Sequence, residues 1–166
     1  MGFLDAVAVC FRKYFDFSGR GSRPEYWWFT LFVVAGSVAT TVLDGILFGF
    51  DAGLTDIART PFGSVFTLAT LIPSVSATAR RLHDMGRSGW AMLLSGIPLT
   101  AVAVLGILYL EDESLFYDAS GESLSSGMLA ASLLAAGATI VTLAVTIWWL
   151  TRPSDLGPNR FGPEPA

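Results

Sequence analysis

The sequence is poor in charge, in cysteine and in histidine, and each shortage excludes a class of protein. Only 14% of the 166 residues are charged, whereas soluble domains carry about 25%, which excludes a soluble enzyme and a disordered chain. Cys10 is the single cysteine, so no disulfide forms within the chain and no oxidising compartment is implied. One histidine and one cysteine do not make a zinc site, and we expect no metal and no cofactor.

Positive charge is also scarce, whereas long apolar runs are abundant. The net charge is −4, which disfavours binding to nucleic acid. No Asp, Glu, Lys or Arg occurs at residues 26–43, 60–79, 88–110 and 123–151. Roughly 20 apolar residues span the hydrocarbon core of a bilayer. We therefore predict an all-α integral membrane protein, a four-helix transmembrane bundle with an interfacial helix before it.

The apolar runs divide the chain into segments of one membrane domain over residues 1–166. The predicted parts are an interfacial segment at 1–25, transmembrane helices at 26–50, 61–79, 89–110 and 127–150, a motif loop at 80–88, an acidic external loop at 111–126 and a tail at 151–166. At residues 2–15 the apolar side chains recur at helical spacing, with Arg12 and Lys13 off that stripe. This pattern is typical of an amphipathic helix in the membrane interface.

The basic residues predict the orientation, because cytoplasmic loops of membrane proteins are enriched in Lys and Arg. The segment before the first span, the loop between the second and third spans and the tail hold nine of the ten basic residues. The opposite side holds only Arg59. With four predicted spans, we therefore expect both termini in the cytoplasm.

Polar residues within the predicted spans have structural and functional interpretations. Ser22 and Glu25 fit a capping box at the start of the first span. Asp44, near the far end of that span, is expected to reach the interface rather than act inside the membrane. Hydroxyl side chains recur along one face of the second and fourth spans, which favours helix packing over a permeation path.

The densest polar cluster follows the second span, at residues 80–90. Its arginines are suited to binding phosphate; His83 is suited to proton exchange, with Asp84 orienting it. The alternative is a structural turn in which the arginines fix the topology. G-x-S-G at residues 86–89 matches a protease nucleophile motif, but the only histidine lies in the same loop, so we reject that interpretation.

Three sequence blocks resemble a known family. They are FDFSGR with SRPEYW at residues 15–27, RRLHD with GRSGW at residues 80–90, and GPNRFG at residues 157–162. In this order they resemble the bacterial inner-membrane family called domain of unknown function 805. The resemblance implies a helical plasma-membrane protein and carries no established reaction.

We expect the three blocks to converge into one cytoplasmic surface. The first hypothesis is that this surface binds an anionic lipid head group or a cytoplasmic protein. The second is a small transporter or channel, and the third, least favoured, is an enzyme acting on a membrane phosphate compound through His83. Membrane lipids are the expected partners, and a homo-oligomer is compatible with the sequence. The predicted ligand-binding residues are Arg20, Arg23, Arg80, Arg81, His83, Asp84, Arg87, Trp90, Asn159 and Arg160.

Overall fold

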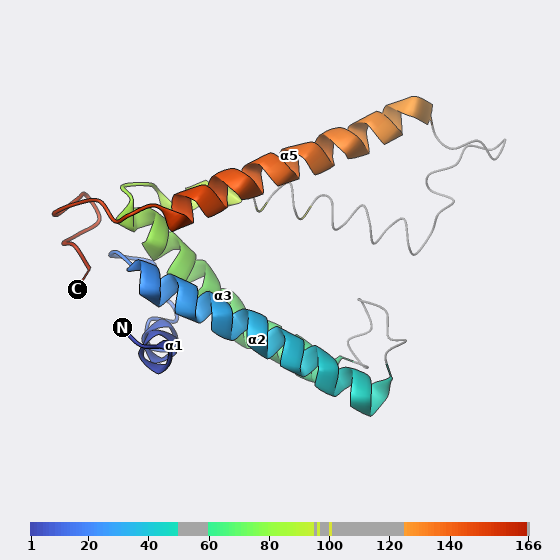
Figure 1. Ribbon diagram of the computed structural model, residues 1–166, viewed down its shortest axis with the longest axis horizontal. Helices are drawn as coiled ribbons and strands as arrows, with labels where there is room; N and C mark the ends of the chain where they lie inside the picture. The colour runs from blue at the N-terminus through green and yellow to red at the C-terminus, as the bar shows by residue number, and fades with distance from the viewer. Residues whose placement is uncertain (50–59, 95, 97–99, 101–124, 166) are drawn as a thin grey trace. The chain divides into compact units, whose positions relative to one another are not determined.

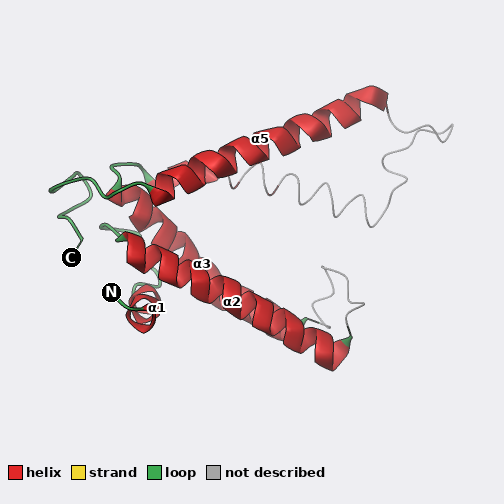
Figure 2. Cartoon of the chain, in the orientation of Figure 1, coloured by secondary structure: helices red, strands yellow, loops and turns green. Residues whose placement is uncertain are grey.

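The regular structure is helical throughout the described part of the chain. The computed structural model describes residues 1–49, 60–94, 96, 100 and 125–165 (Figure 1). Its helices are α1 (Phe3–Arg12), α2 (Arg23–Phe48), α3 (Pro61–Asp84), the short 3₁₀ helix η1 (Gly89–Met92) and α5 (Ser125–Thr151). These residues contain helices and loops but no strand (Figure 2), so the prediction of an all-helical chain is confirmed.

Three helical stretches are long and apolar enough to cross a membrane. They are Arg23–Phe48, Pro61–Asp84 and Leu133–Thr151, which correspond to the first, second and fourth predicted transmembrane helices. Most of the third predicted helix, at 89–110, and of the predicted external loop, at 111–126, lies outside the described residues. The four-helix bundle therefore stays a prediction.

The chain forms two compact units, which we describe separately. The first contains Met1–Gly89 and Pro153–Ala166, and the second contains Trp90–Arg152. The single membrane domain that the sequence predicts is not tested by this grouping. Within the second unit, the hydroxyls of Thr139 and Thr146 donate hydrogen bonds to carbonyls of their own helix, α5, over 2.8 Å each.

In the first unit, α2 and α3 run side by side and α1 lies crosswise to them near the start of α2 (Figure 1). Where they meet, Cys10 of α1, Phe29 of α2 and Ala77 of α3 form one buried cluster. Along the rest of α2 and α3, large apolar side chains such as Val38 and Leu68 are exposed. Apolar exposure of this kind suits contact with lipid.

The start of α2 confirms one half of the predicted capping box. Ser22 Oγ accepts a bond from the Glu25 backbone N–H over 3.4 Å, as an N-cap residue should. The Glu25 carboxylate bonds to Arg80 of α3 instead of turning back to the Ser22 backbone. The side chain that the sequence assigned to a local cap therefore joins two helices.

The start of α3 is capped from the neighbouring helix. Asp44 Oδ1 accepts from the backbone N–H of Phe62 over 3.1 Å, and Oδ2 accepts from that of Gly63 over 2.8 Å. Helix N-termini leave such N–H groups without partners inside the helix and attract negative charge. Asp44 is buried and caps α3, a role that the sequence did not predict, and its position at the interface stays a prediction.

The end of α3 extends beyond the predicted boundary. The helix continues to Asp84, so residues 80–84, predicted as loop, form its last turn. Within α3, Pro73 has no N–H to bond the carbonyl of Ala69 four residues earlier. The Tyr14 hydroxyl donates to that carbonyl over 3.1 Å and so replaces the bond that the proline cannot make.

Replacing Asp44 with alanine should destabilise the first unit by about 1–2 kcal/mol, because two backbone N–H groups of α3 lose their acceptor. Thermal unfolding in detergent micelles, followed by circular dichroism, measures the loss. Asp44→Asn keeps one oxygen acceptor and should lose less. Equal melting of the alanine variant and the parent would contradict the capping role.

Candidate functional site

The motif end is the end of the first unit where the start of α2, the end of α3, residues 13–22, the turn at residues 85–89 and the tail at residues 153–165 meet. Both chain termini also lie there (Figure 1). The side chains at the motif end come from all three sequence blocks. Their bonds decide which of them are accessible to a ligand.

Arg80 is bonded within the protein on several sides. It has no exposed surface. Its Nε and Nη2 donate to Glu25 Oε1 over 3.3 and 2.9 Å. Its Nη1 donates to the carbonyl of Asp16 over 2.7 Å and to Ser76 Oγ over 3.0 Å. Arg80 therefore ties the segment after α1 to both long helices and leaves no guanidinium face for a ligand.

Asp84 lies between two buried arginines from distant parts of the chain. Its Oδ1 accepts from Arg20 Nε over 2.9 Å, and its Oδ2 accepts from Arg81 Nη1. At most 1% of each of these three side chains is exposed. Among the described residues Asp84 makes no bond to His83, so the prediction that it orients the histidine is wrong. Its negative charge instead compensates two buried guanidinium groups.

Arg20 also holds the tail against the end of α3. Its Nη1 donates to the carbonyl of Gly157 and its Nη2 to that of Asp155, over 2.6 Å each. The Asp155 N–H in turn donates to the carbonyl of Asp84 over 3.1 Å. Gly157 has a φ of +72°, a backbone conformation that favours glycine.

His83 is held by the first and third sequence blocks. Its Nδ1 lies 3.1 Å from the carbonyl of Gly19, which can only accept, so Nδ1 carries the proton. Its ring stacks on Phe161, with centroids 3.9 Å apart and an interplanar angle of 4°. Asn159 Nδ2 donates to the carbonyl of His83 over 3.0 Å, and Arg160 Nη2 to that of Gly86 over 3.1 Å.

The predicted convergence of the three blocks is confirmed by these contacts. Arg20 bonds Asp84, and the tail packs on His83. The remaining predicted residues are placed differently. Arg23 is half-buried and Arg87 is exposed at the motif end, whereas Trp90 is exposed in the second unit.

The hydroxyl stripe of α3 is satisfied by its own helix. Thr70, Ser74 and Thr78 each donate to the carbonyl four residues earlier, over 2.7–2.8 Å. Hydroxyls bonded in this way need no ligand or water. Over the described ranges, no three side chains from His, Cys, Asp and Glu come close enough together to hold a metal ion.

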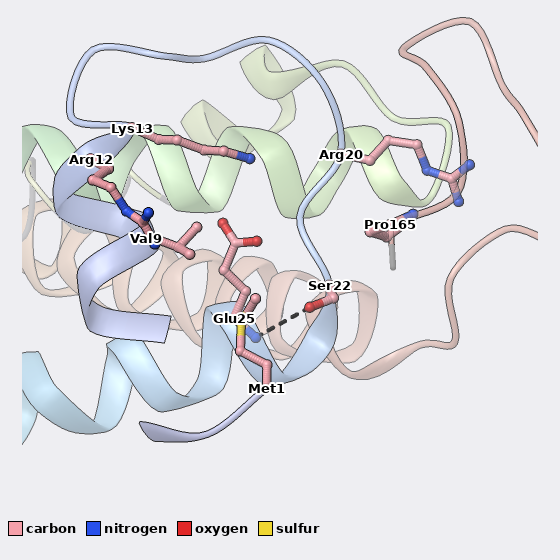
Figure 3. A pocket seen from close by; sticks show the side chains of 8 residues that line it. All are labelled: Met1, Val9, Arg12, Lys13, Arg20, Ser22, Glu25 and Pro165. Carbon is pink, nitrogen blue, oxygen red and sulfur yellow. Dashed lines mark hydrogen bonds between the residues drawn. The ribbon is translucent and has the colours of Figure 1, made fainter. Parts of the chain in front are cut away.

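A pocket of about 450 Å³ opens at the motif end beside α1, and we call it the α1 pocket (Figure 3). Figure 3 shows Lys13 and the Glu25 carboxylate pointing into the same space, while the Arg20 guanidinium points away towards Pro165. Its lining consists of Met1, Val9, Arg12, Lys13, Arg20, Ser22, Glu25 and Pro165. Opposite charges therefore face one open volume.

Cys10 lies buried behind this region, close to Arg80. Burial disfavours the thiolate and, with the nearby Glu25 carboxylate, raises the pKa of Cys10 to about 11. The thiol is therefore protonated at neutral pH and reacts slowly in the folded protein. Since it is the single cysteine, its labelling reports on the opening of this part of the fold.

The family model described as "Protein of unknown function (DUF805)" matches residues 14–163. The chain belongs to this family. The "Inner membrane protein YhaI" of Escherichia coli K12 is 33% identical over 100 residues, which cover 59% of this chain and 76% of that protein. The "Inner membrane protein YhaH" of the same strain is 36% identical over 95 residues, covering 57% and 75% respectively. No solved structure gives a significant match to the chain.

Both relatives are named as inner membrane proteins, and this DUF805 protein has three helices long and apolar enough to cross a membrane. Sequence reasoning placed the ligand site on the shared motifs, but missed Arg12, Lys13, Ser22 and Glu25 of the α1 pocket. The available signal was the pair of adjacent cations, Arg12 and Lys13, which the sequence analysis assigned to the polar side of an interfacial helix and to membrane orientation. Of the motif arginines, Arg20, Arg80 and Arg81 proved to be buried.

Proposed function

We propose that this DUF805 protein crosses the inner membrane several times, keeps its motif end in the cytoplasm and binds the anionic phosphate of a lipid head group there. The nine-to-one distribution of basic residues supports this orientation. Of those nine, the fold buries Arg20, Arg80 and Arg81. Arg12 and Lys13 of the α1 pocket are the better candidates for the lipid.

The disposition of α1 supports a position in the membrane interface. It lies crosswise to α2 and α3 (Figure 1), so it runs along the membrane plane if those two helices cross the bilayer. Phe15 and Phe17, just after α1, are 75% and 40% exposed, and Trp27 near the start of α2 is 39% exposed. Aromatic side chains are favoured at head-group depth.

The observation that carries the proposal is that the two cations of the α1 pocket have no acidic partner. Over the described residues, no carboxylate forms an ion pair with Arg12 or Lys13; the Arg12 side chain makes only a 3.4 Å bond to the carbonyl of Ala8. Two cations without acidic partners in a half-open pocket at the membrane surface suit a phosphate. Transport has less support, because hydroxyls of the α3 stripe bond carbonyls of their own helix. Catalysis has less support, because His83 is stacked on Phe161 of the tail.

The orientation can be tested by cysteine labelling in intact cells. A cysteine at Ser120, in the predicted external loop outside the described residues, should react with an impermeant maleimide. A cysteine at Ser18, which is exposed at the motif end, should react only after the membrane is opened. Native Cys10 is buried, so it stays silent on either side and need not be removed. Labelling of Ser18→Cys from outside would contradict the proposed orientation.

Lipid binding can be tested by native mass spectrometry of the purified protein with phosphatidylglycerol. The double variant Arg12→Gln/Lys13→Gln should bind about tenfold less lipid, because each cation gives the phosphate a charge-assisted bond. The matched control Arg152→Gln/Arg160→Gln also removes two charges, but from outside the pocket. Equal binding by the two double variants would refute the proposed site.

A further inference from the structure

The α1 pocket contains a carboxylate, Glu25, which pairs with the buried Arg80 through one of its two oxygens. The Glu25 side chain is only 6% exposed, and it lines the pocket together with the two cations (Figure 3). Both bonds from Arg80 go to its Oε1. Within the described ranges, Glu25 Oε2 has no bonding partner in the protein.

The carboxylate and the two cations of the pocket are not paired with one another. No ion pair joins Glu25 to Arg12 or Lys13, although all three line the same volume. A simple anion placed against the cations would offer no donor to Glu25 Oε2. A ligand with a phosphate at one end and a cationic donor at the other could bind both the two cations and Glu25 Oε2.

We propose that the α1 pocket selects a phosphoethanolamine head group, and this inference rests on the proposed function. Arg12 and Lys13 bind the phosphate, and Glu25 Oε2 accepts a bond from the primary ammonium. A primary ammonium has three N–H donors, whereas the trimethylated ammonium of phosphatidylcholine has none. Phosphatidylglycerol offers no cation to the carboxylate. The pocket therefore favours phosphatidylethanolamine over both.

The sharpest experiment changes the lipid and leaves the protein intact. Native mass spectrometry of the parent protein compares phosphatidylethanolamine, its mono- and dimethyl derivatives and phosphatidylcholine, all with identical acyl chains. Each methyl group removes a donor while the positive charge stays, so binding should fall stepwise, by about tenfold across the series. Glycerophosphoethanolamine in excess should compete, because the head group carries the selectivity. Equal binding along the series, or no competition, would overturn the inference.

Two protein variants locate the effect in the α1 pocket. Val9→Trp fills the pocket without changing charge and should abolish the preference for phosphatidylethanolamine. Leu4→Trp adds the same ring to a position on α1 that is 78% exposed and lies outside the pocket, so the preference should remain. Loss of the preference in both variants, or in neither, would overturn the assignment to this pocket.

The same data separate this inference from the proposed function. If Arg12→Gln/Lys13→Gln weakens all lipids equally and the methylated series binds uniformly, the phosphate site stands and the ammonium contact is refuted. If that double variant changes no lipid, both are refuted. Glu25→Gln is a weaker test because Glu25 also bonds the buried Arg80, so its melting temperature must match the parent before its lipid preference is compared.

Discussion

Replacing Asp84 with alanine is expected to destabilise the protein by about 3–5 kcal/mol, since it leaves buried guanidinium charges without their carboxylate. Asp84 bonds Arg20 and Arg81, and each of these arginine side chains is at most 1% exposed. From the sequence alone, a change at Asp84 would weaken only ligand binding. Its complete burial makes loss of stability the expected result.

A fluorogenic maleimide that reacts with Cys10 on heating measures this loss, because the thiol is buried in the folded protein. The matched control is Asp155→Asn, which removes a carboxylate near Asp84 and keeps the backbone bonds of Asp155 to Asp84 and Arg20. If Asp84→Ala and Asp155→Asn open at the same temperature, the ion pairs of Asp84 contribute little to stability.

The second large effect is expected from Arg80→Lys, at about 3 kcal/mol. Lysine keeps the positive charge that determines membrane orientation, but it lacks the planar fork with which Arg80 reaches Glu25 and Asp16 together. The variant should insert in the normal orientation and unfold at a lower temperature.

Arg160→Lys is the control for Arg80→Lys, because Arg160 is exposed at the motif end and undergoes the same chemical change. Insertion is checked by glycosylation or protease mapping and stability by the labelling of Cys10. Unchanged stability of Arg80→Lys would mean that the arginine serves topology alone, which is the alternative left open by the sequence.

The sequence predicts the membrane helices well because burial in lipid requires continuous apolar runs. It also predicts that the motif blocks meet, and the bonds of Arg20 and Asn159 bear this out. It does not reveal that Arg80 is an interior residue, because the pattern of an arginine at a helix end is the same whether its partners are protein or water. Those partners, Glu25 and Asp16, are 55 and 64 residues away.

The sequence misses the bonds of Asp44 and Asp84 for the same physical reason. Each carboxylate was interpreted from its neighbours in sequence, as an interfacial group and as a partner of His83. Each instead bonds groups that tertiary packing brings to it, the N-terminus of α3 and the guanidinium of Arg20. The helix continues to Asp84, which places that carboxylate against the segment before α2.

The bonds of Arg20 impose an order on biogenesis. Its carboxylate partner Asp84 is synthesised 64 residues later, and the carbonyl of Asp155 that completes its bonds 135 residues later. If α2 and α3 cross the bilayer as proposed, Arg20 lacks its carboxylate partner until α3 has been synthesised. The tail is synthesised after α3, so its bonds to Arg20 are the last that the chain can complete.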